Sequence, residues 1–221
     1  QVVVSAGPTR EHFDPVRVLT NPSTGKMGYA VAEAAARLGA DVVLVSGPTQ
    51  ITEPSGIEII RVTNAEEMRC EMVAHAALAD VVIMAAAVSD FRPVAPVPEK
   101  LKKAAGDAMS WKVERTPDIL EELQQLRGNR TLVGFAAETS NLEARSREKL
   151  ARKGCDLIVA NLVGAGGTGF EVETNEVVIL DRLGGSVTAG PALKADIASS
   201  ILDAILEFRQ RLGIASPEKA G

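Results

Sequence analysis

Loops rich in small residues are the parts of this sequence whose residue types could bind an anion. The first apolar run ends in Ser5-Ala6-Gly7-Pro8, and a later loop, residues 21–28 (NPSTGKMG), leads into a helical pattern. Small residues let backbone N–H groups approach an anion, and the positive end of a helix favours negative charge. The two loops therefore predict a site for a phosphate-bearing ligand. A turn that merely joins a strand to a helix would show the same residues.

Lysines occur in two arrangements that could serve such a ligand. The run Lys-Leu-Lys-Lys at residues 100–103 closes a proline-rich segment that follows a strand-like run. A lysine in a closing loop could stabilise the charge of a triphosphate, whereas most charge runs are simply solvated. Lys149 and Lys153 are four residues apart and share one helix face, so they either clamp a phosphate or face solvent.

Two familiar nucleotide motifs do not fit. A Walker A loop requires Gly-Lys-Ser/Thr, but Gly25-Lys26 is followed by Met27. A dinucleotide-binding fingerprint requires a second glycine two residues after the first, and Thr9 stands at that distance from Gly7. The sequence therefore predicts a phosphate site outside both classes.

Metal and disulfide chemistry are not favoured by the residue spacing. The two histidines are isolated, and Cys70 and Cys155 lack partners at ligand spacing. We expect both thiols to be buried or inert rather than joined in a disulfide. A metal would be Mg²⁺ or Mn²⁺, held mainly by phosphates with one carboxylate such as Asp90.

Alternating strand and helix patterns position these loops. Short runs rich in Val and Ile, several of them continuous rather than alternating, indicate strands buried on both faces of a parallel sheet. They lie at residues 2–4, 42–45, 57–62, 81–84, 132–135 and 157–159. Helical patterns separate them, and their expected ends are the Gly39 stop, an Asn64 cap with Glu67, a Thr116 cap before Pro117, and an Asn141 cap with a Gly154 stop. The sequence predicts a Rossmann-like three-layer α/β/α fold.

The segment 164–191 breaks this alternation. It begins with several glycines and continues with an alternating run that predicts a hairpin of residues 177–180 and 187–189, turning at 183–185. Val177, Ile179 and Val187 give it one apolar face that requires cover. We expect a projecting β-hairpin arm that pairs with a second subunit.

Composition limits the class of protein. The chain has 221 residues, of which 46% are apolar and 24% charged, with a formal charge of −5. These values exclude a disordered chain, and the acidic excess with only 3% aromatic residues argues against nucleic-acid binding. No apolar run reaches membrane-spanning length, so we expect a cytoplasmic protein. Gln1 opens inside a strand-like run, which suggests a piece of a longer chain, with one domain over 1–212 and a flexible tail over 213–221.

Several stretches together resemble one enzyme family. They are SAGPTREHFDPVRVLTNPSTGKMGYA, LVSGP, AAAVSDFRP, PEKLKK, TPDIL, VGFAAET and DLIVANLV, and they occur in order along nearly the whole chain. The sequence closely resembles phosphopantothenoylcysteine synthetase, the phosphopantothenate–cysteine ligase of coenzyme A biosynthesis. That family usually forms the C-terminal half of a bifunctional bacterial protein whose decarboxylase (lyase) half, absent here, would carry FMN.

The resemblance implies the reaction and the partners. The carboxylate of 4′-phosphopantothenate attacks the α-phosphate of CTP, pyrophosphate leaves, and L-cysteine then displaces CMP from the acyl-cytidylate. The KLKK form of the lysine run implies CTP rather than ATP. The family forms a homodimer that completes the substrate site, which here implies the 164–191 arm.

The resemblance also implies the site residues. Lys100 corresponds to a lysine on a flexible flap, and Asn21 to the residue that stabilises the acyl-cytidylate. Arg17 and Ala87, together with Asn21, resemble contacts to phosphopantothenate. The expected nucleotide contacts, besides Lys100, are Gly7, Ser23, Gly25, Ala85, Ala86, Asp90, Pro117, Asp118, Ile119, Leu120, Phe135, Lys149 and Lys153.

Two other functions fit the residues alone. One is a nicotinamide-dependent reductase on the same fold, which the failed fingerprint and the lack of a Tyr-x-x-x-Lys pair weaken. The other is a non-catalytic nucleotide-sensing module that binds CTP without turnover.

Overall fold

A single eight-stranded sheet forms the centre of the molecule. The computed structural model describes residues 1–100, 102, 110–138, 141–162 and 173–214. The strand order is β12-β11-β10-β9-β6-β1-β4-β5, and the six strands from β10 to β5 are parallel. Their bounds are β1 Val2–Ala6, β4 Val42–Ser46, β5 Glu58–Arg61, β6 Val81–Met84, β9 Thr131–Glu138 and β10 Leu157–Leu162. All six predicted strands are confirmed, and the central ones carry continuous apolar runs because both of their faces are buried.

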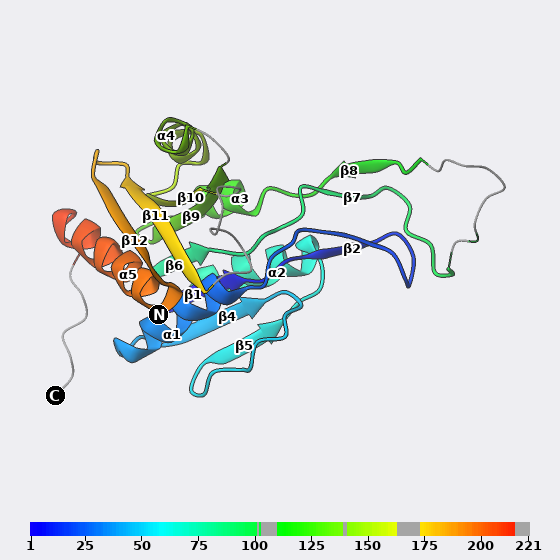
Figure 1. Ribbon diagram of the computed structural model, residues 1–221, viewed down its shortest axis with the longest axis horizontal. Helices are drawn as coiled ribbons and strands as arrows, with labels where there is room; N and C mark the ends of the chain where they lie inside the picture. Colours follow the sequence, from blue (N-terminus) through cyan, green and yellow to red (C-terminus); the bar gives the residue numbers. More distant parts are fainter. Residues whose placement is uncertain (101, 103–109, 139–140, 163–172, 215–221) are drawn as a thin grey trace.

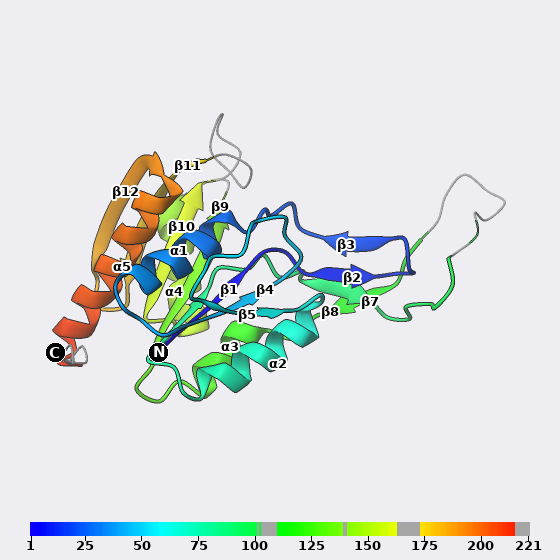
Figure 2. The ribbon, with the colours of Figure 1, turned by 90° about the horizontal axis from the view of Figure 1, so that it is seen from below.

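Helices cover both faces of the sheet (Figures 1 and 2). One layer contains α1 (Lys26–Arg37) and α5 (Lys194–Arg211), which pack against each other and share one apolar core. The other contains α2 (Ala65–Ala76), α3 (Ile119–Gln125) and α4 (Leu142–Lys153), over a second core. The predicted three-layer α/β/α fold is therefore confirmed. In the part of the chain that the structure describes, no helix is long and apolar enough to cross a membrane.

The helix ends follow the sequence signals at most positions. Asn64 caps α2 by accepting a hydrogen bond from the Glu67 N–H at 2.8 Å, and α4 ends at Gly154 in the left-handed conformation. Asn141 stands at the start of α4 without a side-chain cap bond. The predicted Thr116 cap is wrong. Its hydroxyl donates to the Ser89 carbonyl at 2.6 Å, and Asp118 caps α3 instead.

The predicted hairpin exists, but it does not project from the sheet. Strands β11 (Thr174–Asp181) and β12 (Ser186–Leu193) continue the main sheet in antiparallel fashion beyond β10. Val177 and Ile179 are buried in the core that α5 covers, so their apolar face meets a helix of the same chain rather than a second subunit. Residues 163–172, the first part of the expected arm, lie outside the described residues.

A different part of the chain projects (Figures 1 and 2). Two antiparallel ribbons, β2 (Arg10–His12) with β3 (Val18–Thr20) and β7 (Phe91–Pro93) with β8 (Val113–Arg115), extend away from the sheet. These four strands, together with the described residues of the loops 13–17 and 94–112, are called the arm below. Phe13 and Trp111 join the two ribbons with ring centroids 4.4 Å apart. The sequence patterns did not predict this arm.

Neither cysteine forms a disulfide. Cys155 is buried, and burial raises the pKa of its thiol to about 12, which makes it inert as predicted. Cys70 is a free cysteine that is exposed on α2, so of the two expected thiols only Cys155 is buried.

Candidate functional site

A cavity of about 880 Å³ opens at the carboxyl edge of the parallel strands. Its walls come from the loop before α1, the segment after β6, the turn before α3, the end of β9, and α4. In open α/β sheets, ligands bind beyond the carboxyl ends of the strands, and a cavity of this size suits a small-molecule site.

Most of the residues expected at the site line this one cavity. They are Asn21, Ser23, Gly25, Ala85, Ala86, Ala87, Asp90, Pro117, Asp118, Ile119, Leu120, Phe135, Lys149 and Lys153. Gly7 is not among the lining residues and lies directly behind the loop, because a Cβ on Gly25 would stand 3.2 Å from the Gly7 Cα. Arg17 and Lys100 do not line the cavity. Both belong to the arm.

The loop before α1 can present backbone donors to an anion. Gly25 is the N-cap residue with φ of 81°, a left-handed conformation that favours glycine, and no side chain caps the helix. Gly28 lets the helix approach β1, since a Cβ there would stand 2.6 Å from the Ala6 Cβ. Because Gly25 has no side chain to cap the helix, the N–H groups in the first turn of α1 lie at the cavity wall, where they suit a phosphate.

Asn21 joins this loop to the segment after β6. Its Nδ2 donates to the carbonyl oxygens of Ala87 and Val88, at 3.2 and 3.0 Å. The Ser89 N–H donates to the buried Thr9 hydroxyl at 2.9 Å, which fixes the same segment from behind. In this arrangement, the Asn21 amide sets the position of two cavity walls.

The end of the cavity next to α4 carries two lysines, and both bond to other groups of the protein. Lys149 Nζ donates to the Phe135 carbonyl at 2.7 Å, and Lys153 pairs with Asp118. Partial burial alone would raise the pKa of Asp118, but the hydrogen bonds from Lys153 and from the Glu121 N–H lower it below its ordinary value. The Asp118 carboxylate therefore stays charged and engaged, which leaves the backbone of this turn to contact a ligand.

Other polar residues line the cavity that the sequence patterns did not single out. They include Arg115, Glu121, Arg152, Asn161, Asn175 and Lys194. Asn161 lies near the carboxyl end of β10, directly after a run of apolar residues, and this position is a signal that could have identified it. Asn175 and Lys194 come from β11 and α5, whose place beside the cavity depends on where the hairpin joins the sheet.

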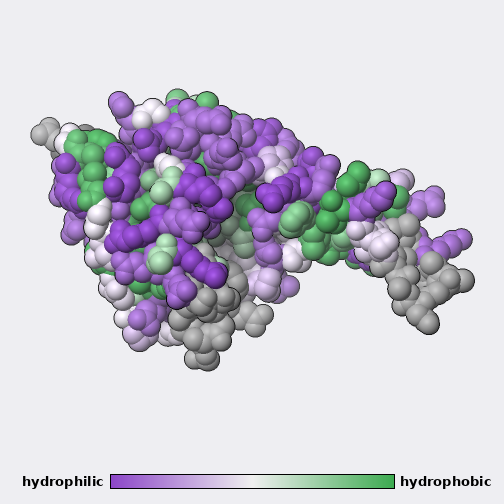
Figure 3. Space-filling view, turned by 90° about the horizontal axis from the view of Figure 1, so that it is seen from above, coloured by the Kyte–Doolittle hydropathy of each residue, from purple (hydrophilic) through white to green (hydrophobic). Residues whose placement is uncertain are grey.

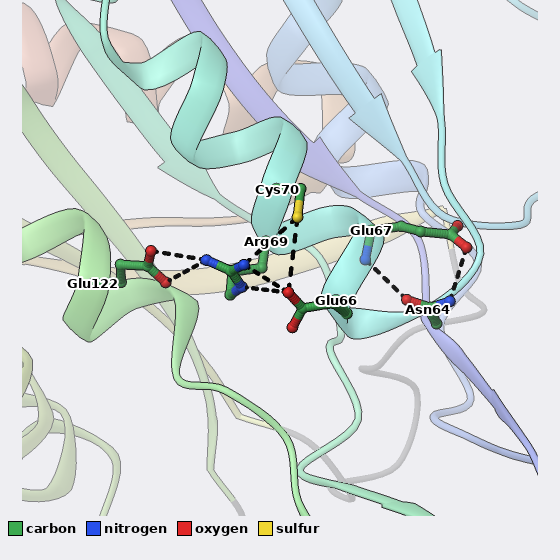
Figure 4. Close-up of polar contacts among 6 residues, drawn as sticks. All are labelled: Asn64, Glu66, Glu67, Arg69, Cys70 and Glu122. Carbon is green, nitrogen blue, oxygen red and sulfur yellow. Dashed lines mark hydrogen bonds and ion pairs between the residues drawn. The ribbon is translucent and has the colours of Figure 1, made fainter. Parts of the chain in front are cut away.

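An arginine on α2 holds the α3 wall of the cavity (Figure 4). Arg69 donates to Glu122 on α3 at 2.9 Å and to Glu66 on its own helix at 2.6 Å. The hydrogen bond from Arg69 is the main reason that the pKa of Glu66 lies below its ordinary value. Because α3 begins directly after the cavity turn, this link positions the turn.

We expect Arg69→Met to lower the free energy of unfolding slightly at neutral pH, because solvent weakens ion pairs near the surface. Because the pKa of the Glu66 carboxyl is lowered in the folded state, this group stabilises the fold at pH values above its ordinary pKa. That stabilisation is lost as the pH falls through the lowered pKa. The difference from the unmodified chain should therefore shrink in acid, as measured by urea unfolding from pH 7 to 3. Arg37→Met, which breaks the exposed 3.8 Å pair with Glu33, is the matched control and should have a smaller effect. A difference that grows in acid would contradict this reading.

Fold and cavity together define a doubly wound α/β protein with a cavity at the carboxyl edge of its sheet. The sequence profile of the DNA/pantothenate metabolism flavoprotein C-terminal domain matches residues 1–208. The chain belongs to this family.

Curated relatives and solved structures agree with this assignment. The chain is 46% identical over 213 residues to the coenzyme A biosynthesis bifunctional protein CoaBC of Bacillus subtilis (strain 168), which covers 96% of this chain and 52% of that protein. It is 41% identical over 219 residues to the protein of the same name from Mycobacterium tuberculosis (strain ATCC 25618 / H37Rv), covering 94% and 52%. The chain thus spans about half the length of the curated relatives it matches.

Two solved structures share the fold. The C-terminal domain of a coenzyme A biosynthesis bifunctional protein CoaBC superposes with a TM-score of 0.81 at 37% identity, over 95% of both chains. A Cab2 mutant in complex with phosphopantothenate-cysteine gives a TM-score of 0.76 at 16% identity, over 96% of this chain and 87% of that one. At that identity the second likeness shows the fold alone.

Proposed function

We propose that this domain ligates 4′-phosphopantothenate with L-cysteine to give 4′-phosphopantothenoylcysteine, using CTP to activate the carboxylate. The observation that carries the proposal is the gathering, in one cavity, of the glycine loop, the Ala85–Ala87 strand end, the Asp118 turn and the α4 lysines. The family membership and the relatives named for coenzyme A biosynthesis support it.

The reaction needs positioning and charge stabilisation more than a protein nucleophile. The phosphopantothenate carboxylate oxygen attacks the α-phosphorus of CTP, the bond to the β-phosphate oxygen breaks, and pyrophosphate leaves. The cysteine amine then attacks the acyl carbon of the acyl-cytidylate, loses a proton, and displaces CMP. The uncapped start of α1 would hold the phosphates, and the turn before α3 with Phe135 would contact the base.

A magnesium ion would suit this site only as a companion of the nucleotide. Among the described residues, no group of three or more His, Cys, Asp or Glu side chains is arranged to hold a metal. Asp90 lines the cavity and could supply one oxygen ligand, with phosphate oxygens completing the shell. When bound, the ion would neutralise phosphate charge.

The arm is the surface that we propose for a homodimer (Figure 3). Several exposed apolar side chains cluster on the arm, whereas on most protein surfaces such side chains occur singly. They are Val16 at 61%, Phe91 at 43%, Val94 at 52%, Trp111 at 38% and Val113 at 43% exposure. Arg17 and Lys100 lie on the same arm, outside the cavity of their own chain. A dimer through the arm would bring them to the cavity of the partner.

We expect light scattering to show that the protein is a dimer. The double variant Val94→Glu/Val113→Glu should be a monomer with little ligase activity. Buried carboxylates at the interface would oppose association. Leu78→Glu is the matched control, because Leu78 is 81% exposed and lies outside the arm. A fully active monomer would refute the shared site. Charged substitutions at Val177 or Ile179 should unfold the chain instead, since both are buried beneath α5.

A pyrophosphate-release assay with CTP, 4′-phosphopantothenate and cysteine tests the proposed function directly. The ligase should release pyrophosphate only when CTP and phosphopantothenate are both present, and should form product only after cysteine is added. A nucleotide sensor would bind CTP without release, and a reductase would instead oxidise a nicotinamide cofactor.

A further inference from the structure

All four strands of the arm begin or end at segments that line the cavity or lie directly behind it (Figure 2). On the inner side of the arm, β2 follows the turn at Gly7, β3 leads into Asn21, β7 follows Asp90, and β8 leads into Thr116. These four junctions are called the roots of the arm below. Because arm and cavity walls are continuous pieces of chain, a change in the angle of the arm would shift the walls.

Hydroxyl groups of three threonines tie the four roots together. The Thr20 hydroxyl donates to the Thr9 carbonyl at 2.7 Å, which joins the root of β3 to that of β2. The Thr9 hydroxyl accepts from the Ser89 N–H at 2.9 Å, which joins the root of β2 to that of β7. The Thr116 hydroxyl donates to the Ser89 carbonyl at 2.6 Å, which joins the root of β7 to that of β8. Thr9, Thr20 and Thr116 are called the root threonines below.

Thr9 is the centre of this arrangement. It is fully buried and is not among the residues that line the cavity. A hydrogen bond shielded from water is stronger than an exposed one, and the loss of one partner leaves a costly unpaired group. The pairing of β1 with β6 also extends to a bridge between Pro8 and Ala87, next to Thr9. The root threonines therefore continue the order of the sheet into the arm.

Polar contacts, rather than an apolar core, attach the arm to the sheet and helices. No described residue of the four arm strands belongs to either apolar core. The other buried attachment is Glu11 on β2, which is 5% exposed and accepts from the Ala65 N–H at the start of α2 at 2.9 Å. The helix dipole favours a carboxylate there. With so little apolar packing at its base, the arm depends on these hydrogen bonds for a fixed angle.

We infer that the root threonines are positioning residues of the proposed ligase. They fix the angle of the arm and therefore the place of Lys100 relative to the cavity. The inference rests on the proposed function for the role of Lys100. It applies equally to the cavity of the same chain and to that of a partner, because the angle of the arm sets the place of Lys100 in both cases. Threonines that merely satisfy buried backbone groups would form the same bonds, so mobility and kinetics must separate the two roles.

Trp111, the only tryptophan of the sequence, reports the mobility of the arm. It lies on the arm against Phe13. Time-resolved fluorescence anisotropy of the unmodified chain should decay mainly with the tumbling of the whole molecule. Thr9→Val should add a faster component, because segmental motion occurs in nanoseconds to microseconds. Thr9→Ser keeps the hydroxyl and should restore the slow decay.

Thr131→Val is the matched control. Thr131 is 1% exposed, and its hydroxyl accepts from Arg209 at 3.0 Å at the opposite edge of the sheet. This variant also loses a buried hydroxyl, so it should lower the melting temperature much as Thr9→Val does, yet leave the Trp111 decay and kcat unchanged. Thr20→Val, at an exposed residue, should add the faster component to a smaller extent, and it replaces Thr9→Val if that variant does not fold.

The rate of pyrophosphate release tests the link to Lys100. Thr9→Val should lower kcat by about tenfold or more, because a displacement of about 1 Å can cost about 100-fold. The KM for CTP should stay nearly unchanged, since Thr9 does not line the cavity. In a Lys100→Gln background, Thr9→Val should cause little further loss, as expected for two changes that act on one interaction.

The contrary outcomes distinguish failure of the inference from failure of the proposed function. An unchanged Trp111 decay in Thr9→Val, or a faster decay that Thr9→Ser does not reverse, would show that the root threonines do not fix the arm. A full additional loss of rate in the Lys100→Gln background would overturn the positioning role, because Thr9→Val would then act on the cavity walls themselves. If the unmodified chain released no pyrophosphate, the proposed function would fail, and the anisotropy measurements alone would decide whether the root threonines hold the arm.

Discussion

Replacing Asn21 by Asp should leave acyl-cytidylate formation largely intact and slow its transfer to cysteine by about 100-fold, the effect typical of losing one donor to a developing oxyanion. The structure adds a physical reason. The Asn21 Nδ2 donates to the Ala87 and Val88 carbonyls, and a carboxylate at this position would face two carbonyl oxygens instead. The cavity walls that these bonds hold would separate, and negative charge would enter where the tetrahedral intermediate develops its own.

Single-turnover measurement of acyl-cytidylate and of product would follow the two steps separately. Asn21→Ala is the matched control, since it removes both hydrogen bonds without adding charge. If Asn21 acts only by joining the two walls, the alanine variant should be as slow as the aspartate variant. If the added charge matters, Asn21→Asp should accumulate more intermediate. Normal product formation by Asn21→Asp would remove this residue from the mechanism.

The central sheet could be predicted from the sequence because its strands are buried on both faces. Residues 42–45 and 81–84 are continuous runs of apolar residues with clear ends, and they pair in register with β1 as parallel neighbours. The residues at the ends of these strands also allowed much of the cavity lining to be predicted. Once the fold is doubly wound, the residues that follow β1, β6 and β9 must meet at one edge.

The hairpin and the arm could not be placed from the sequence, for different reasons. The alternation at Val177 and Ile179 predicts an apolar face but cannot tell whether a helix of the same chain or a second subunit covers it. Here α5, which comes later in the chain, covers that face. The arm strands are three residues each, too short for a periodic pattern, and Pro93 interrupts the strand signal. Lys194 was missed because its place beside the cavity depends on the position of the hairpin.

Replacing Lys100 by Gln should reduce pyrophosphate release by about 100-fold or more, the size expected for a well-placed donor to a charged transition state, with the fold intact. Lys100 is exposed and lies on the arm, outside the cavity of its own chain. It can therefore act only if the arm closes over that cavity or reaches the cavity of a partner. Lys102→Gln, which changes an exposed neighbour in the same basic run, is the matched control and should keep nearly full activity.

Mixing two variants that each form little product, and following product rather than pyrophosphate release, decides between the two routes. If the arm serves the partner, a dimer of one Asn21→Asp chain and one Lys100→Gln chain contains one cavity with both residues intact and one with neither. Random exchange gives half mixed dimers with one working site each, so about a quarter of the activity should return in a symmetric dimer. If Lys100 serves its own cavity, every site carries one lesion and the mixture stays inactive. Near-normal pyrophosphate release by Lys100→Gln alone would instead assign this lysine to the solvated surface of the arm.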